Sequence, residues 1–125
     1  MNARQRELLM TERELDDAIY ALAAGIDKTP RALLCAYHTR DSRRSLPGFP
    51  DWCFAGARGV MFRECKTQRG HLRLEQSRWL DALRAGGADA GVWRPADLLS
   101  GRIARELMHL SGLRPVVDER GSLNV

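Results

Sequence analysis

Residues 51–66, DWCFAGARGVMFRECK, decide the expected fold because two short apolar runs flank a glycine-rich turn. The runs at 51–55 and 60–66 each predict a β-strand, and GARG at 56–59 predicts the turn between them. The two strands are therefore expected to pair as a hairpin.

Three charged side chains mark the open end of this hairpin. Asp51 begins the first strand, and Glu64 and Lys66 end the second. Because successive side chains on a strand point to opposite faces, Glu64 and Lys66 share a face and Cys65 points away from it. If the last residue of the first strand pairs with the first residue of the second, Asp51 lies opposite Glu64. The hairpin thus predicts two carboxylates and a lysine at one end of a sheet.

The rest of the chain alternates helical and strand-like patterns. Thr11 and Glu14 form a capping-box pattern, and apolar residues then recur at helical spacing as far as Gly25, a natural stop. This order of elements predicts an α/β domain with a mixed sheet of about four strands flanked by helices. The patterns beyond Gly25 predict a strand at 32–39, the hairpin, a helix at 71–87, a strand at 88–95 and a helix at 96–110 with Gly101 as its weak point.

The composition places the chain in a broad class. With 125 residues, 44% of them hydrophobic and 29% charged, it is typical of a single globular domain, 1–125. We expect the core of the domain at about 11–98, followed by a C-terminal helix and tail at 99–125. No stretch resembles a membrane span or a secretion signal, so no membrane partner is expected. The net charge of +4 permits a nucleic-acid partner without requiring one.

The cysteines indicate a compartment rather than a site. Cys35, Cys53 and Cys65 are odd in number and lack metal-binding spacing, which favours reduced thiols in a cytoplasm. We interpret all three as small buried residues of strands.

The charged end of the hairpin has a chemical interpretation. Asp51 and Glu64 could hold a hard divalent cation such as Mg²⁺, and the backbone carbonyl of Cys65 could supply a further oxygen. Lys66 could orient water or offset charge that builds on a phosphate. The D-x12-E-x-K spacing alone is not specific, and a surface hairpin with an ordinary Glu–Lys pair would also explain it.

Longer motifs are more specific than this spacing. They are YHTRDSRRSLPGFPD at 37–51, RECKTQRGHLRLEQSRWLDAL at 63–83 and GVWRPADL at 91–98. With them the chain resembles the PD-(D/E)xK nucleases, and within these the VRR-NUC group of virus-type replication and repair nucleases, over roughly residues 11–97. The resemblance implies a restriction-endonuclease-like core.

The resemblance also implies roles for individual residues. Asp51 and Glu64 would bind Mg²⁺ or Mn²⁺, and Lys66 would assist catalysis. A helix near the start of such enzymes often contributes a further acid. Glu12 matches it by its place on the inward stripe of the first helix, with Glu14 as the second choice; a solvated first-turn acid is the competing explanation.

Gln76 matches the glutamine that begins the helix after the ExK strand. It is expected near the cleft, hydrogen-bonded to a metal-bound water or to DNA. The sequence departs from the family pattern at two positions. Cys65 stands where an apolar residue such as leucine is usual, and Trp52 stands where a smaller aliphatic residue is expected.

Basic and polar residues precede the hairpin and could contact the DNA backbone. A solvated run of charge is the alternative interpretation. The predicted DNA-binding residues are His38, Arg40, Ser42, Arg43 and Arg44. A looser basic rim would add Arg69, His71 and Arg73.

The resemblance predicts a metal-dependent DNA endonuclease that leaves a 5′ phosphate and a 3′ hydroxyl, acting in the cytoplasm of a bacterium or a phage-infected host. Compact stand-alone members resemble Holliday-junction resolvases, which predicts branched DNA as substrate and a homodimer. A flap or nicking nuclease of phage DNA replication or packaging is the second choice. A catalytically silent DNA-binding subunit is an alternative from another class. A purely structural role is the weakest alternative.

Overall fold

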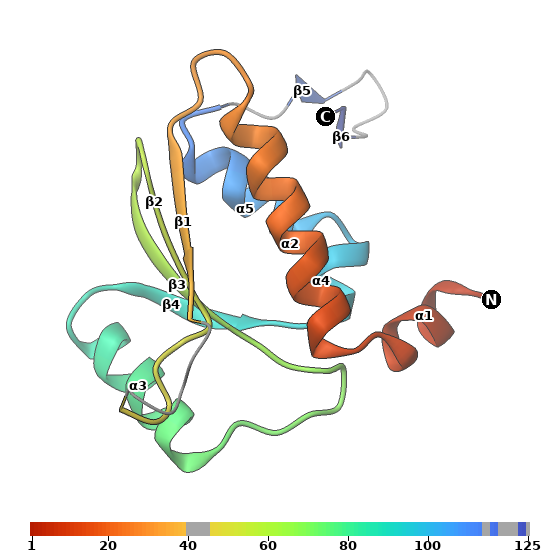
Figure 1. Ribbon diagram of the computed structural model, residues 1–125, viewed down its shortest axis with the longest axis vertical. Coiled ribbons are helices and arrows are strands. Elements are labelled where there is room, and N and C mark those ends of the chain that lie inside the picture. The colour runs from red at the N-terminus through yellow and green to blue at the C-terminus, as the bar shows by residue number, and fades with distance from the viewer. Residues whose placement is uncertain (40–45, 114–115, 118–122, 125) are drawn as a thin grey trace.

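The computed structural model describes residues 1–39, 46–113, 116–117 and 123–124. It contains a four-stranded sheet with helices on both sides (Figure 1). The α/β architecture with a mixed sheet flanked by helices is therefore confirmed. The strands of the sheet are β1 (Leu34–His38), β2 (Trp52–Gly56), β3 (Gly59–Cys65) and β4 (Asp89–Trp93). The helices are α1 (Ala3–Leu9), α2 (Glu12–Asp27), α3 (Leu74–Ala85), α4 (Pro95–Leu99) and α5 (Arg102–Leu110). A separate two-residue pair joins β5 (Val116–Val117) and β6 (Leu123–Asn124).

The order of strands in the sheet is β1-β2-β3-β4. The first three strands form an antiparallel meander, and β4 joins β3 in parallel after the excursion through α3. Ala55 pairs with Val60 and Trp52 pairs with Arg63, so the register continues with Asp51 opposite Glu64. The predicted pairing of the hairpin is confirmed.

The main core lies between one face of the sheet and the helices α2 and α5. Phe54 and Trp93 from the sheet are fully buried, and so are Leu15 and Ile19 from α2. The helix α2 begins at the predicted capping box, in which Thr11 accepts from the Glu14 backbone. Its apolar stripe then packs the helix across the sheet.

Three sequence predictions are wrong in detail. Gly25 does not end the first helix, because Ile26 is buried in the core and the helix continues to Asp27. The predicted helix at 96–110 is two helices, since Gly101 adopts a left-handed φ of 84° between α4 and α5. The cysteines do lie in strands, but only Cys65 is buried, whereas Cys35 is exposed on an edge strand.

Among the described residues, no helix combines the length and the apolar character that crossing a membrane requires.

Candidate active site

Asp51 and Glu64 meet at the end of the sheet where β2 begins and β3 ends. Oδ2 of Asp51 accepts a hydrogen bond of 2.8 Å from the backbone N–H of Cys65. The N–H of Lys66 donates to the carbonyl of Trp93 on β4. Because strand residues alternate the edge to which their N–H and C=O point, the Cys65 carbonyl faces the opposite edge, toward Asp51. The two carboxylates and this carbonyl thus share one end of the sheet.

Glu64 is the more buried of the two acids. It is 3% exposed, and its Oε1 accepts a hydrogen bond of 2.8 Å from Nε2 of Gln76 on α3. Burial, followed by the negative charge of Asp51, raises the pKa of Glu64 from 4.5 to about 8. Without a cation, this environment favours the protonated form of Glu64.

The pKa of Asp51 is also raised. Burial raises the pKa of Asp51, the hydrogen bond from Cys65 opposes this rise, and the charge of Asp16 on α2 adds to it. Burial disfavours the ionised form of both carboxylates, and this creates a local demand for positive charge.

Lys66 supplies part of that charge. Its side chain is largely buried, with Nζ 4.0 Å from Oε1 of Glu64 and 3.9 Å from Oε1 of Glu12. The predicted shared face of Glu64 and Lys66 is consistent with this geometry. Glu12 is therefore connected to the site by its ion pair with Lys66, and the Glu12 side chain is half exposed. Glu14 instead caps α2 through Thr11.

Asp16 is the site residue that sequence reasoning missed. Its Oδ1 accepts a hydrogen bond of 2.9 Å from the indole N–H of Trp52. Its Oδ2 lies 3.2 Å from Nε2 of His38 on β1. Trp52 itself is 3% exposed and packs edge-on to His38. Asp16 lies four residues after Glu12, so both acids share a side of α2. This spacing is the sequence feature that could have identified Asp16 as a site residue.

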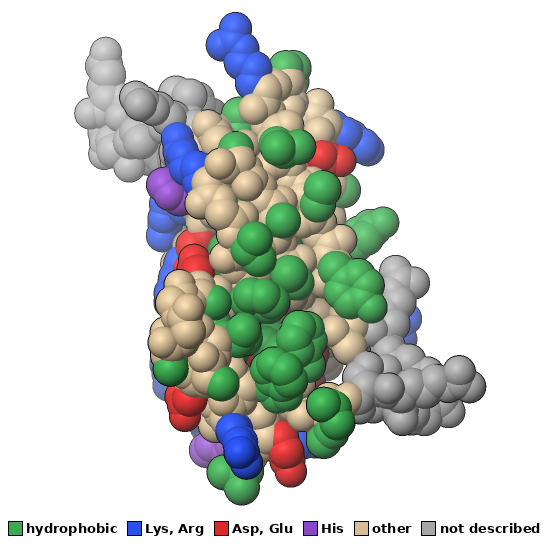
Figure 2. All heavy atoms as spheres, turned by 90° about the vertical axis from the view of Figure 1, so that its left-hand side faces the viewer, with side chains coloured by type: hydrophobic (Ala, Val, Ile, Leu, Met, Phe, Trp, Pro, Cys, Tyr) green, Lys and Arg blue, Asp and Glu red, His purple; other side chains and the backbone are tan. Residues whose placement is uncertain are grey.

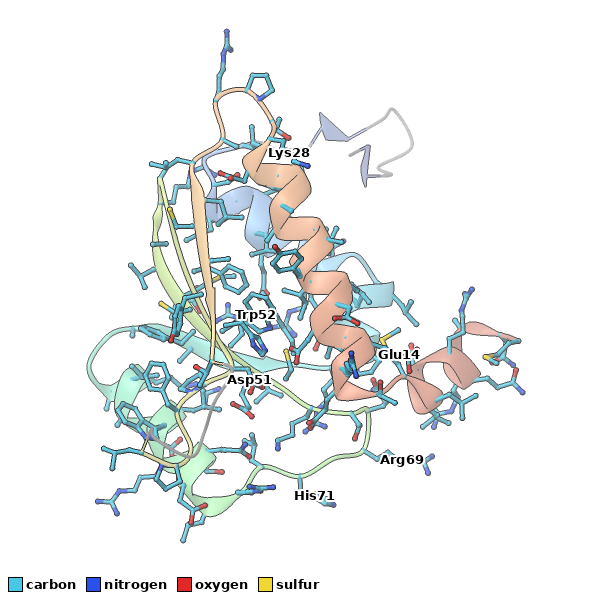
Figure 3. All side chains as sticks on the ribbon, viewed as in Figure 1. Glu14, Lys28, Asp51, Trp52, Arg69 and His71 are labelled. Atoms are coloured by element: carbon cyan, nitrogen blue, oxygen red, sulfur yellow. The ribbon has the colours of Figure 1, made fainter. Side chains whose placement is uncertain are left out.

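The predicted DNA-binding residues fall into two groups. His38 lies at the end of β1 beside Asp16, with its side chain a quarter exposed. Arg40, Ser42, Arg43 and Arg44 lie outside the described residues. The looser rim residues Arg69, His71 and Arg73 are exposed, and Figure 3 shows Arg69 and His71 pointing away from Asp51.

The donor set fits a hard divalent cation. Oε2 of Glu64 is a buried oxygen with no hydrogen-bond partner among the described residues, although its sister oxygen is satisfied. Buried oxygens normally have a partner, so an unpaired one beside a second carboxylate suits a metal ion. Mg²⁺ is commonly held by one or two carboxylates with several waters. Asp51, Glu64 and the Cys65 carbonyl can supply such a set. No group of three or more His, Cys, Asp or Glu side chains within the described part of the chain gathers as a metal site.

The architecture defines an α/β protein with a restriction-endonuclease-like mixed sheet. Its fold is similar to that of a solved structure described as "VRR_NUC domain protein", with a TM-score of 0.54. The similarity covers 86% of this chain and 98% of that structure, at 16% sequence identity. No family model matches the sequence, and the comparison with curated proteins finds no match. The similarity shows a common fold, and the roles of the site residues stay predictions.

Proposed function

We propose that this protein is a metal-dependent DNA endonuclease. The observation that carries the proposal is the buried Oε2 of Glu64 beside Asp51, which has no hydrogen-bond partner among the described residues, with Lys66 within 4.0 Å of Glu64. Isolated pairs of buried acids are costly, and a pair at an open sheet end is suited to cation binding. The sequence resemblance to VRR-NUC nucleases and the similar fold support the reaction class.

A Mg²⁺ or Mn²⁺ ion bound there would polarise a phosphodiester and lower the pKa of a bound water. The chain's own residues would orient the metal-binding groups and stabilise the developing charge. Asp51 is held by the Cys65 N–H, and Glu64 is held by Gln76, so both acids are oriented before a substrate arrives. The Lys66 ammonium would stabilise negative charge that develops on the phosphate oxygens.

The proposal extends to branched DNA as the substrate and to a homodimer as the active form. Both rest on the resemblance to compact resolvase-like nucleases. Two sites in a symmetric dimer would allow paired nicks on the two strands of a four-way junction. A flap or nicking activity is the alternative substrate preference.

The test compares cleavage of a labelled four-way junction, a flap, linear duplex and single strand, each with Mg²⁺, Mn²⁺ or EDTA. Lys66→Ala should abolish cleavage. Lys28→Ala is the matched control, because Lys28 is exposed at the far end of α2 (Figure 3).

Metal-dependent cleavage that is lost only in Lys66→Ala supports the proposal, and paired nicks confined to the junction support resolvase activity. Equal cutting of every substrate would contradict the junction preference alone. Retained DNA binding with no cutting in any metal would replace the nuclease with a DNA-binding subunit.

A further inference from the structure

One face of the sheet carries an apolar surface, and Asp51 and Glu64 lie at the end of this same face because they alternate with Cys53 and Phe62 along their strands. The register places Cys35 opposite Ala55, Tyr37 opposite Cys53, and Cys53 opposite Phe62, so all five side chains share a face. The core lies on the other face. We call this surface the outer sheet face, and its residues are Leu33, Cys35, Tyr37, Cys53, Ala55, Val60 and Phe62. None of them is charged.

Several of these side chains are far more exposed than is usual for their type. Tyr37 is 67% exposed, Leu33 is 60% exposed and Val60 is 49% exposed. Figure 2 shows the resulting cluster of hydrophobic side chains. Among the described elements, α2 and α5 pack on the opposite face, and α3 contacts the sheet mainly at β4. The β1 and β2 part of the outer sheet face therefore has no helix over it within the described residues.

The apolar surface continues toward α3. Phe62 packs edge-on to Phe49, which packs edge-on to Trp79. Beyond Trp79 lies an apolar hollow of about 390 Å³ against α3, which Leu46 borders while 77% exposed. The outer sheet face and this hollow form one apolar surface.

The exposed area suits a protein interface. Monomeric proteins rarely expose a contiguous apolar patch larger than roughly 300–600 Å², and exposed apolar patches of that kind mark interaction sites. A standard interface takes about 800 Å² from each partner. The exposed apolar side chains of the outer sheet face and the adjoining hollow are therefore suited to one side of a dimer.

The chemistry of the surface favours a second copy of the chain. The outer sheet face carries neither lysine nor arginine, which a DNA backbone would require. In a two-fold dimer the same patch meets itself, and an uncharged patch does so without like-charge repulsion. At the α3 end, the rim carries Glu75 and Arg78, one acid and one base, so two copies can pair opposite charges.

We propose that two copies of this chain associate through the outer sheet face. The inference locates the interface of the homodimer included in the proposed function. It stands independently of nuclease activity, since its test needs neither DNA nor metal.

The first test is sedimentation equilibrium over a wide range of protein concentration. Wild type should dimerise, and Tyr37→Lys and Val60→Lys should each weaken dimerisation by about tenfold or more, because each buries an unpaired charge in an apolar interface. Leu9→Lys is the control, since Leu9 is 65% exposed on α1, outside the outer sheet face. Thermal melts check that each variant folds. A wild type that stays monomeric, or variants that dimerise like wild type, would overturn the proposal.

Cys35 gives a second readout, because it is exposed in the single chain and lies on the proposed interface. Its reaction rate with a thiol reagent should fall several-fold as wild type dimerises, and Cys35→Ser identifies the signal. In Tyr37→Lys the rate should stay high at the same concentration. A dimer in which Cys35 reacts at the monomer rate would place the interface elsewhere.

Discussion

Nε2 of Gln76 donates a hydrogen bond of 2.8 Å to Oε1 of Glu64, which joins α3 to the charged end of β3. The same side chain accepts from the Arg73 N–H through Oε1, so its amide is fixed in orientation. Gln76 was expected to contact a metal-bound water or DNA. In the structure it orients the buried acid, whose other oxygen has no hydrogen-bond partner within the described part of the chain.

Replacing Gln76 with alanine should weaken metal binding. Outer partners of metal-binding groups typically contribute 10–100-fold to affinity or activity, so Gln76→Ala should raise the Mn²⁺ dissociation constant by about that factor. Isothermal titration with Mn²⁺ measures it. Gln5→Ala is the control, because Gln5 caps α1. Equal Mn²⁺ affinity in wild type and Gln76→Ala would contradict a role in orienting Glu64.

The metal-free protein should lose stability as pH rises through the range set by Glu64. The pKa of Glu64 is raised from 4.5 to about 8, so between these values the folded chain holds a proton that the unfolded chain has released. The stabilisation is complete below pH 4.5 and is lost as pH rises toward 8, with a slope of at most about 1.4 kcal/mol per pH unit. Urea unfolding in EDTA measures this dependence.

Glu64→Gln should remove the part of this slope that Glu64 contributes, because the amide does not titrate, and should leave the part that comes from the raised pKa of Asp51. The comparison isolates the contribution of Glu64 from that of the other ionisable groups. Saturating Mg²⁺ should raise wild-type stability most at the alkaline end, since cation binding requires the ionised carboxylate. Parallel pH profiles for wild type and Glu64→Gln would show that Glu64 is ionised without a metal.

Removing the carboxylate of Asp16 should destabilise the fold. Asp16→Ala leaves the buried indole N–H of Trp52 without its acceptor, at a cost of about 1–3 kcal/mol in the free energy of unfolding. Asp17→Ala is the matched control, because Asp17 is the next residue and is exposed. Asp16→Asn, which keeps an oxygen acceptor, should recover much of the loss. Equal stability of Asp16→Ala and Asp17→Ala would rule out a structural role for the Trp52 bond.

Gly48 should not tolerate a side chain. It has a φ of +94°, and an added Cβ would lie 2.5 Å from the backbone carbon of Glu75 on α3. Gly48→Ala should therefore cost more than the roughly 1–3 kcal/mol typical of backbone strain alone. Gly59→Ala is the control for strain, because Gly59 has a φ of +134° with nothing within 4 Å of an added Cβ. Urea unfolding of both variants compares them, and equal losses would mean that the close approach to Glu75 relaxes.

The hairpin could be predicted from sequence because its signals are local. Alternating apolar residues and the glycines at 56 and 59 define the strands and the turn, and the turn defines the register that brings Asp51 to Glu64. The capping box of α2 is local for the same reason. These features depend on residues only a few positions apart.

The missed features depend on tertiary packing. Trp52 and Asp16 are 36 residues apart, and their bond depends on where α2 crosses the sheet. Trp52 looked too large for its strand, but its ring points into the core and finds an acceptor there. Gly25 looked like a helix end, but burial of Ile26 outweighs the low helix propensity of glycine.

The unequal sequence separations within the sheet also imply an order of assembly. The β2–β3 pair is closed by a tight turn, and hairpins of this kind form in microseconds. The parallel partner β4 is separated from β3 by the whole of α3, so its loop-closure entropy is larger and its docking is slower. Asp51 and Glu64 would therefore meet before Gln76 and Asp16 reach them. We expect a divalent cation present during refolding to accelerate the early phase, since it would relieve the repulsion between the two acids while the rest of the site is still forming.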